Sequence, residues 1–156
     1  MSRKKISDFD KFKVRVELIR ESNAPPRHSV TSPLEVAKLV SHLNKKDREY
    51  FLCIHLDSRN AVIGIEEVTI GSLNAALVHP REILKGALLN NAAGIILVHN
   101  HPSGDCDPSE DDIEITGRLT KACDIIGIEA LDHIIVGAGK YFSFKEKNIM
   151  PKGGNE

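Results

Sequence analysis

Cysteine is scarce in this sequence of 156 residues, which contains Cys53, Cys106 and Cys123, an odd number of widely spaced thiols. No two of them form a Cys-x-x-Cys pair, the spacing used by structural zinc sites and redox motifs. The pattern therefore argues against a disulfide scaffold and against a zinc finger. It is typical of a reduced protein, and we expect a cytoplasmic location.

An excess of charge of one sign is also missing, because 21 lysines and arginines stand against 22 aspartates and glutamates, a formal net charge of −1. General nucleic-acid binders usually carry a basic excess, so the composition disfavours, without excluding, a nucleic-acid partner. Long apolar runs are missing too. Ser-Arg-Lys-Lys follows Met1, and the longest wholly apolar run of the second half, residues 95–98, is far shorter than a membrane span. We expect a soluble protein with no secretory signal and no membrane contact.

The length of the chain and its 41% hydrophobic residues suit one domain. We place this domain at residues 31–150, between an N-terminal arm (1–30) and a flexible tail (151–156). The arm contains an alternating apolar and charged stretch at 12–18, typical of one strand, followed by Pro25-Pro26. That strand could join a neighbour's sheet in a dimer or pair within its own chain, so the oligomeric state stays open.

Helical and strand patterns alternate along the rest of the chain and predict an α/β sandwich of two or three layers, a mixed β-sheet flanked by helices. The expected strands are 49–56, 61–70, 93–98, 131–136 and 141–144, with a short hairpin turn between the first two. The expected helices start at Ser32-Pro33, after His79, and at Ser109, the last ending near residue 126 with Gly127 as C-cap. The apolar residues expected to face inward are Leu34, Ala37, Leu39, Val40 and Leu43 in the first helix and Ile83, Leu84, Ala87 and Leu88 in the second.

The segment from His99 to Asp112 carries the residues that suggest chemistry. His99 and His101 are two positions apart at the end of an apolar strand, so both imidazoles project to the same side and can reach one ion. Asp112, in the first turn of the following helix, can offer a carboxylate oxygen from another direction. Two nitrogens and one oxygen leave the fourth tetrahedral position to water, which is the ligand set of a catalytic zinc ion. The sequence therefore predicts one Zn²⁺ per chain.

The same residues have simpler explanations. Ser109 and Asp112 fit a helix N-cap with an acidic residue three positions later, and such a cap would also hold Asp112 rigidly. His99 could be a buried structural histidine, and a His-x-His pair is a weak signal when it stands alone. The adjacent triplet His-Asn-His is not evidence for the nuclease motif of that name, whose residues are spread over tens of positions.

The pattern His-x-His, seven residues, then Ser-x-x-Asp is complete at His99, His101, Ser109 and Asp112, and it resembles the JAMM metalloprotease motif of the JAB/MPN superfamily. Further similarity, to the RadC family in particular, lies at residues 79–82, 91–93, 102–104 and 131–136. The resemblance covers about residues 30–146. It implies an MPN or cytidine-deaminase-like α/β fold, with zinc on the two histidines and the aspartate.

The resemblance also implies an upstream glutamate that acts as general base. We assign this role to Glu49, because in the superfamily this residue lies at the start of an early apolar strand. Glu82 is the alternative, although its place at a helix start suits a carboxylate that interacts with the helix dipole. Glu66 and Glu67 are more distant candidates, better explained as solvated charges on an edge strand.

The activity implied by the resemblance is that of a zinc metallopeptidase acting on a peptide or isopeptide amide of a peptide or protein substrate. Glu49 would take a proton from the attacking water, and Ser109 would donate a hydrogen bond to the oxyanion. Candidates for contacts behind the ligands are Asn100, Ser103, Glu82 and His133. Each also has a simpler explanation, as a turn residue, a helix-start carboxylate or a buried structural histidine.

Two features depart from the family pattern. Full-length RadC proteins carry a helix-hairpin-helix region ahead of this domain. We do not expect residues 1–30 to form such a region, and a DNA-repair role would then lose its DNA-binding part. Cys106-Asp107 replaces the more usual Pro-Thr, and a thiol so near the zinc could be an adventitious ligand, although a partly exposed loop thiol is simpler. The alternatives to a peptidase are a DNA-repair-associated RadC-like protein, acting as nuclease or accessory factor, and a non-catalytic MPN module that binds partners.

Overall fold

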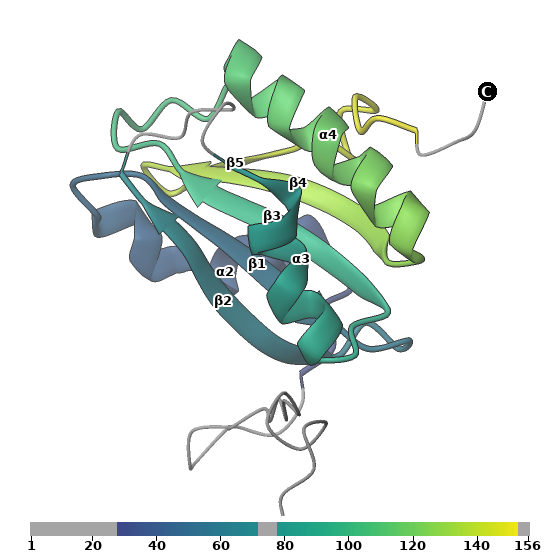
Figure 1. Cartoon of the computed structure of the whole chain (residues 1–156). Coiled ribbons are helices and arrows are strands. Elements are labelled where there is room, and N and C mark those ends of the chain that lie inside the picture. Colours follow the sequence, from purple (N-terminus) through teal and green to yellow (C-terminus); the bar gives the residue numbers. More distant parts are fainter. Residues whose placement is uncertain (1–27, 72–77, 153–156) are drawn as a thin grey trace, which may run out of the picture.

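The computed structural model describes residues 28–71 and 78–152 of the chain. In these ranges five strands form one mixed sheet with helices on both faces (Figure 1), which confirms the predicted α/β sandwich. The strand predicted at 12–18 lies outside the described residues, as does most of the predicted tail. None of the helices described is long and apolar enough to cross a membrane. The elements are α2 (Pro33–Leu39), the 3-10 helix η1 (Ser41–Lys45), β1 (Tyr50–Leu56), β2 (Val62–Ile70), α3 (Pro80–Leu89), β3 (Gly94–Asn100), α4 (Glu110–Ile126), β4 (Glu129–Gly137) and β5 (Lys140–Ser143).

The strands follow the order β2-β1-β3-β4-β5 across the sheet. β1 is antiparallel to β2, and the predicted hairpin turn joins them, with Asn60 N donating to Asp57 O over 3.0 Å. β1 also pairs antiparallel with β3, whereas β3 is parallel to β4 and is connected to it through α4 in a βαβ unit. β3 is thus the central strand, and its entire length is buried, as its apolar sequence predicts.

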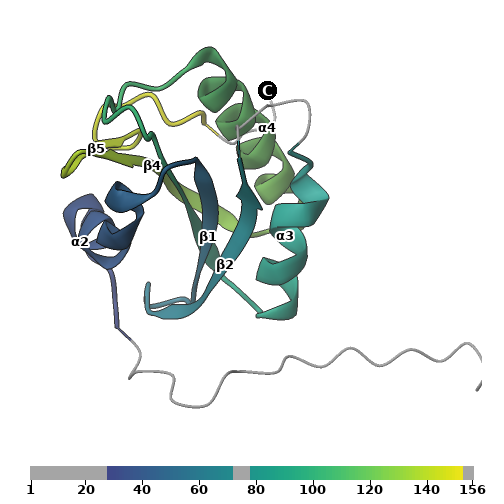
Figure 2. The ribbon, with the colours of Figure 1, turned by 90° about the vertical axis from the view of Figure 1, so that its left-hand side faces the viewer.

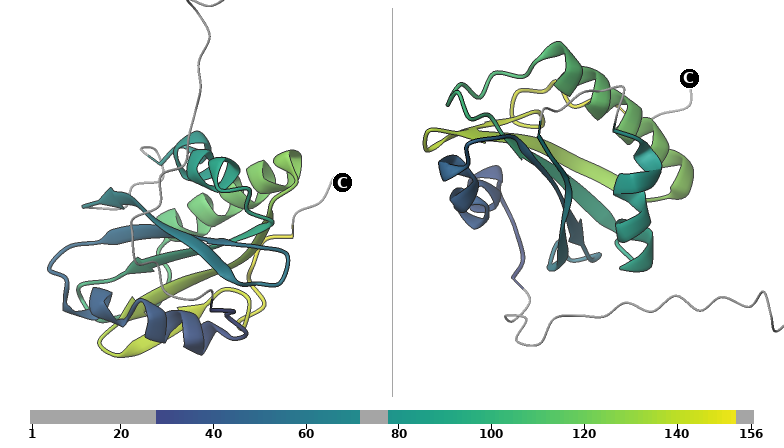
Figure 3. Two further views of the ribbon diagram at one scale, coloured as in Figure 1. Left: turned by 90° about the horizontal axis from the view of Figure 1, so that it is seen from below. Right: turned by 60° about the vertical axis from the view of Figure 1, so that its left-hand side comes forward.

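Alternate residues of β3 face two different apolar layers. α3 and α4 cover one face of the sheet, where Ile95 and Leu97 pack against residues of both helices (Figure 2). α2 and η1 cover the other face, where Ile96 and Val98 pack, and Figure 3 shows the same three layers from two other directions. Because side chains alternate along a strand, His99 continues the row that faces α4.

The inward face of the first helix differs from the prediction. The buried residues are Val36, Val40 and Leu43, whereas Leu34 and Leu39 are 46% and 39% exposed. At about 100° per residue, Leu34 lies about 160° around the helix from Val36, so both cannot face the sheet. The helix also ends at Leu39, and a 3-10 helix carries the last buried leucine.

The inward face of α3 also differs from the prediction, at Leu88. This residue was expected to face inward with Ile83, Leu84 and Ala87, which are buried, but it is 53% exposed. Leu88 lines a surface groove between α3 and α4 instead of lying beneath α3. The helical periodicity was right, but the width of the buried stripe depends on how closely the next helix approaches.

α4 has the two ends that the sequence predicts. Ser109 is its N-cap, and Ser109 and Asp112 exchange the two side-chain-to-backbone hydrogen bonds of a capping box. Gly127 is the C-cap, with a left-handed φ of 74°. The helix therefore begins at a defined place, with a buried Asp112 in its first turn.

Candidate metal centre

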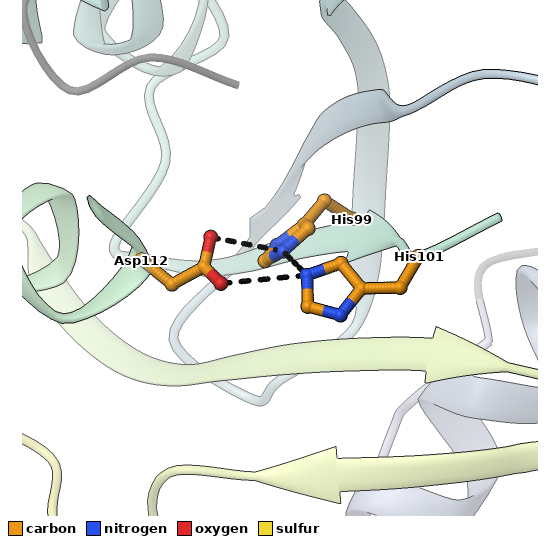
Figure 4. Close-up of side chains that lie close together, drawn as sticks. All are labelled: His99, His101 and Asp112. Carbon is orange, nitrogen blue, oxygen red and sulfur yellow. Dashed lines mark hydrogen bonds and ion pairs between the residues drawn. The ribbon is translucent and has the colours of Figure 1, made fainter. Parts of the chain in front are cut away.

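The end of β3 and the start of α4 bring three side chains together (Figure 4). His99 Nε2 lies 3.0 Å from His101 Nε2 and 3.1 Å from Asp112 Oδ1, and His101 Nε2 lies 3.4 Å from Asp112 Oδ2. Among the described residues, these three form the group whose ligand atoms, all within 4.8 Å of one another, could hold a metal ion. The fold therefore assembles the residues that the sequence suggested as ligands.

The spacing of these atoms fits a tetrahedral zinc ion. Ligand atoms about 2.0–2.1 Å from Zn²⁺ at tetrahedral angles are about 3.3 Å apart, which is close to the separations between the two histidines and the aspartate. His99 and Asp112 are buried, whereas His101 is partly exposed, so the site opens to solvent beside His101. Two ring nitrogens and one carboxylate are the donor set of a site that keeps a further position for water or substrate.

Asp112 is held by the cap at the start of α4. Its Oδ2 accepts hydrogen bonds of 2.7 Å from the backbone N and from Oγ of Ser109. Burial alone would raise the pKa of the Asp112 carboxyl. The neighbouring imidazoles of His101 and His99 and the N–H of Ser109 outweigh burial and hold this pKa well below its usual range. The carboxyl group is thus ionised, as a metal ligand must be.

Behind His99, a chain of hydrogen bonds runs from β3 to α4. His99 Nδ1 lies 2.8 Å from His133 Nε2, and His133 Nδ1 lies 2.6 Å from Thr116 Oγ1. Thr116 Oγ1 is also 2.5 Å from the backbone carbonyl O of Asp112. The structure thus places His133 in contact with a candidate ligand. Sequence reasoning missed Thr116, although its position four residues after Asp112 puts both on one helix face.

The turn after β3 holds His101. Its Nδ1 lies 2.7 Å from the carbonyl O of Asp105, within the same turn. Gly104 has a φ of 85°, and a Cβ added at Gly137 would come within 3.1 Å of the Gly104 backbone, so this turn packs closely on the end of β4. Ser103 is exposed, and its Oγ accepts from Asp105 N over 3.3 Å. Ser103 therefore helps to shape the turn.

Glu49 lies on the same face of the sheet as the two histidines. Phe51 pairs with His99 in the β1–β3 ladder, so continuing the antiparallel register by two residues places Glu49 opposite His101. The pKa of His101 is raised, first by the nearby carboxylate of Asp112, against the effect of burial, and with a smaller contribution from the charge of Glu49. The charge of Glu49 therefore acts on one of the candidate ligands.

Asn100 fixes the chain around this glutamate. Asn100 Oδ1 accepts a hydrogen bond of 2.8 Å from Tyr50 N, and its Nδ2 donates to the carbonyl O of Arg48 over 3.0 Å. The side chain is buried and bonds to both peptide units that flank Glu49. Asn100 on β3 therefore holds the backbone of the neighbouring segment, which carries the candidate base Glu49.

The other candidate glutamates lie in different surroundings. Glu82, in the first turn of α3, is paired with Lys85 over 3.3 Å, and this bond is the main cause of its lowered pKa. Glu66 is not the solvated edge charge that the sequence suggested, because its Oε2 is buried and lies 3.6 Å from His55 Nε2. A Cβ on Gly86 of α3 would overlap this carboxylate, so Glu66 points under the helix. Glu67 is exposed, as expected.

Cys106 is neither a partly exposed loop thiol nor directed at the ligands. Its Sγ is buried beside Ile135 and Phe144, and the thiol donates to the carbonyl O of Gly137 over 3.5 Å. Burial raises the pKa of this thiol, which disfavours the thiolate that metal binding needs. Cys106 therefore serves the packing of the loop against β4.

Comparison with known proteins agrees with the fold. Residues 30–149 match the family model of the RadC-like JAB domain. The mixed sheet with helices on both faces is the α/β architecture of a JAB/MPN domain. The chain belongs to the RadC-like JAB family.

Several relatives of similar sequence are UPF0758 proteins. A UPF0758 protein of Desulfitobacterium hafniense is 46% identical over 143 residues, 89% of this chain and 63% of that protein. A UPF0758 protein of Caldanaerobacter subterraneus is 47% identical over 141 residues, 88% of this chain and 60% of that protein. A UPF0758 protein of Methanosarcina acetivorans is 44% identical over 126 residues, 80% of this chain and 55% of that protein. The chain thus spans less than two thirds of the length of these relatives.

Proposed function

We propose that this chain is a zinc-dependent hydrolase, a JAMM-type metallopeptidase that cleaves a peptide or isopeptide amide in a peptide or protein substrate. The observation that carries the proposal is the convergence of His99, His101 and Asp112, whose ligand atoms lie within 4.8 Å of one another. The β1–β3 register also supports it, because continuing this register two residues beyond the pair Phe51–His99 would bring Glu49 opposite His101. The family match over residues 30–149 adds support, because the motif of the JAB/MPN superfamily falls on these residues.

The proposed chemistry assigns one task to each residue of the site. His99, His101 and Asp112 would hold the zinc ion, which would supply a bound water with a pKa of about 7 and a Lewis acid for the carbonyl group. Glu49 accepts a proton from the attacking water and delivers it to the nitrogen of the leaving amine. Its place opposite His101, at the partly exposed side of the site, suits contact with both water and substrate.

Ser109 has two tasks in this proposal. Its hydroxyl hydrogen is directed at Asp112 Oδ2, 2.7 Å away, and so helps to hold the carboxylate. To stabilise a developing oxyanion, the hydroxyl rotates from Asp112 to the carbonyl oxygen of the substrate, while the backbone N–H of Ser109 keeps its own bond to Asp112. One hydrogen bond is thus exchanged for another during the reaction.

The first experiment measures zinc by atomic emission on the purified full chain, with His101→Ala and His42→Ala compared after circular dichroism has established equal folding. We expect about one zinc per chain in the wild type, loss of zinc in His101→Ala, and no loss in His42→Ala, because His42 is an exposed histidine on η1. A wild type that binds no zinc even after refolding with excess metal would contradict the proposal and favour a non-catalytic module.

The second experiment measures hydrolysis of a mixture of unmodified peptides and, in parallel, of single- and double-stranded DNA. Glu49→Gln should keep its zinc and lose about 10²–10⁴-fold in the rate of peptide cleavage. Glu82→Gln is the matched control, because Glu82 is an exposed glutamate paired with Lys85, and its activity should equal that of the wild type. Zinc-dependent cleavage of DNA without cleavage of peptides would instead establish the nuclease alternative.

A further inference from the structure

We propose that His133 and Thr116 are positioning residues that select one tautomer of His99 and so present the lone pair of His99 Nε2 to a metal ion. An imidazole binds metal through a nitrogen that carries no hydrogen, so the tautomer of His99 decides whether the ligand set is complete. The inference rests on the proposed metal site. Its evidence is the direction of three hydrogen bonds that lie behind the ligands.

The bond between Thr116 and the backbone of α4 decides which atoms donate in the hydrogen bonds behind His99. Thr116 Oγ1 lies 2.5 Å from the carbonyl O of Asp112, and a carbonyl oxygen only accepts, so the hydroxyl donates its single hydrogen there. Towards His133 the same hydroxyl then offers a lone pair. The 2.6 Å contact between His133 Nδ1 and Thr116 Oγ1 is therefore a bond in which Nδ1–H donates.

The burial of His133 decides the next bond. The ring is fully buried, stacked on Phe144 with a centroid distance of 4.9 Å and in edge contact with Phe51 at 5.7 Å. These apolar surroundings disfavour an imidazolium, so a ring with its hydrogen on Nδ1 keeps Nε2 as an acceptor. Across the 2.8 Å contact, His99 Nδ1–H is then the donor, and His99 Nε2 retains its lone pair.

The lone pair selected in this way points to the centre of the ligand group. His99 Nε2 faces His101 Nε2 at 3.0 Å and Asp112 Oδ1 at 3.1 Å. His101 reaches the same tautomer by another route, because its Nδ1 lies 2.7 Å from the carbonyl O of Asp105, which only accepts. Both histidines therefore present Nε2, one through side chains of α4 and β4 and the other through its own turn.

The hydrogen-bond chain also couples the ligands to each other. Its last acceptor is the backbone carbonyl of Asp112, the residue that supplies the carboxylate. α4 contributes Asp112 and Thr116 one turn apart, and β4 contributes His133, in parallel register with Leu97 of β3. A displacement of α4 along the sheet would thus disturb the carboxylate and the tautomer of His99 together.

Zinc affinity of the full chain, measured by competition with a chromophoric chelator, tests the inference without a substrate. His133→Leu and Thr116→Val each interrupt the chain of hydrogen bonds behind His99. We expect the zinc dissociation constant to rise about 10–100-fold in either variant. His133→Gln keeps an acceptor near the position of Nε2 and should recover most of the affinity. Thr120→Val is the matched control. Thr120 Oγ1 is also buried on α4 and also donates to a backbone carbonyl, that of Thr116 over 2.9 Å, but it makes no part of the hydrogen-bond chain behind His99.

A spectroscopic measurement separates positioning from a loss of packing. Long-range ¹H–¹⁵N correlation spectra of the zinc-loaded wild type should show His133 with its hydrogen on Nδ1 and an unprotonated Nε2. In Thr116→Val, where Nδ1 has lost its acceptor, the spectra should show a mixture of both tautomers of His133.

Two results would overturn the inference: zinc affinity in Thr116→Val equal to that of the wild type, or a hydrogen on Nε2 of His133 in the wild type. If His133→Leu does not fold, Thr116→Val decides alone, because valine preserves the shape of threonine. If the wild type binds no zinc, the proposed function fails, and the tautomer of His133 in the zinc-free chain then decides the inference separately.

Discussion

Asn100 Oδ1 accepts a hydrogen bond of 2.8 Å from the backbone N of Tyr50, at the point where the backbone pairing of β1 with β3 ends. Its amide also donates to the carbonyl O of Arg48 over 3.0 Å, so one side chain binds both peptide units next to Glu49. In the sequence, Asn100 stands between the two candidate histidine ligands. The proposed base and the proposed ligands are therefore coupled through one residue of the central strand.

Replacing Asn100 by alanine should loosen the segment that carries Glu49 and leave zinc binding intact. Two buried hydrogen bonds are lost, which corresponds to roughly 1–3 kcal/mol of unfolding free energy. The amide of Tyr50 should exchange with solvent much faster, as hydrogen-exchange NMR would show. Ser103→Ala, in the exposed turn, is the control with unchanged exchange. Unaltered exchange at Tyr50 in Asn100→Ala would refute the coupling.

Ser109→Ala should weaken both the start of α4 and the affinity for zinc. The loss of an N-cap side chain costs about 0.5–2 kcal/mol, and removal of a partner that orients a ligand lowers metal affinity by about tenfold. Ser32→Ala is a matched control, because Ser32 caps α2 in the same way, with its Oγ accepting from Glu35 N. Urea denaturation should show comparable losses of stability in the two variants. Chelator competition should show weaker zinc binding in Ser109→Ala alone, and equal zinc affinities would contradict the role of Ser109.

Removal of zinc should lower the thermal stability of the chain. A ligand that binds only the folded state at 100 times its dissociation constant adds about 2.7 kcal/mol, which corresponds to about 5–10 °C in Tm for a chain of this size. Differential scanning calorimetry with and without a chelator measures this shift. His101→Ala should show no chelator-dependent shift, and a shift of equal size in that variant would place the metal elsewhere.

The buried His55 should make the protein less stable as the pH falls from 6.5 towards 5. Burial lowers the pKa of His55 to about 4 from its usual 6.5, so between these values the unfolded chain binds a proton that the folded chain does not. Stability therefore rises with pH in this window. One proton corresponds to about 1.4 kcal/mol per pH unit, so His55 alone should remove about 1.5 kcal/mol of unfolding free energy between pH 6.5 and 5.0.

His55→Asn is the variant that tests this pH dependence. It keeps an acceptor for Asn90 Nδ2, which lies 3.1 Å from His55 Nδ1, and removes the titration. Glu66, which faces His55, has a pKa raised first by burial and so acts in the opposite direction, but it is present in both proteins. Urea denaturation at the two pH values should show the smaller pH dependence in the variant. Identical pH dependence in both proteins would contradict the assignment.

The element pattern and the ligand triad could be predicted from the sequence because both depend on local order. An apolar run marked β3, a Ser-x-x-Asp pattern marked the start of α4, and short spacing brought two histidines to one strand end. The inward face of α2 could not be predicted, because Leu34 and Val36 are both apolar and only the position of the sheet decides which is buried. Glu66 was misjudged for a similar reason, since a charged residue on an edge strand appears solvated until a helix is placed above it.

The sequence by itself determined the order of helices and strands, the caps of α4 and the residues of the candidate metal centre, because periodicity, capping and close spacing are properties of neighbouring residues. Only the tertiary structure decided that Glu49 lies opposite His101, that Asn100 binds the backbone around it, and that Thr116 and His133 stand behind His99. The hydrogen bonds among them join residues 17 to 52 positions apart. They depend on strand register and on the placement of α4 over β4, and no local pattern of residues encodes either one.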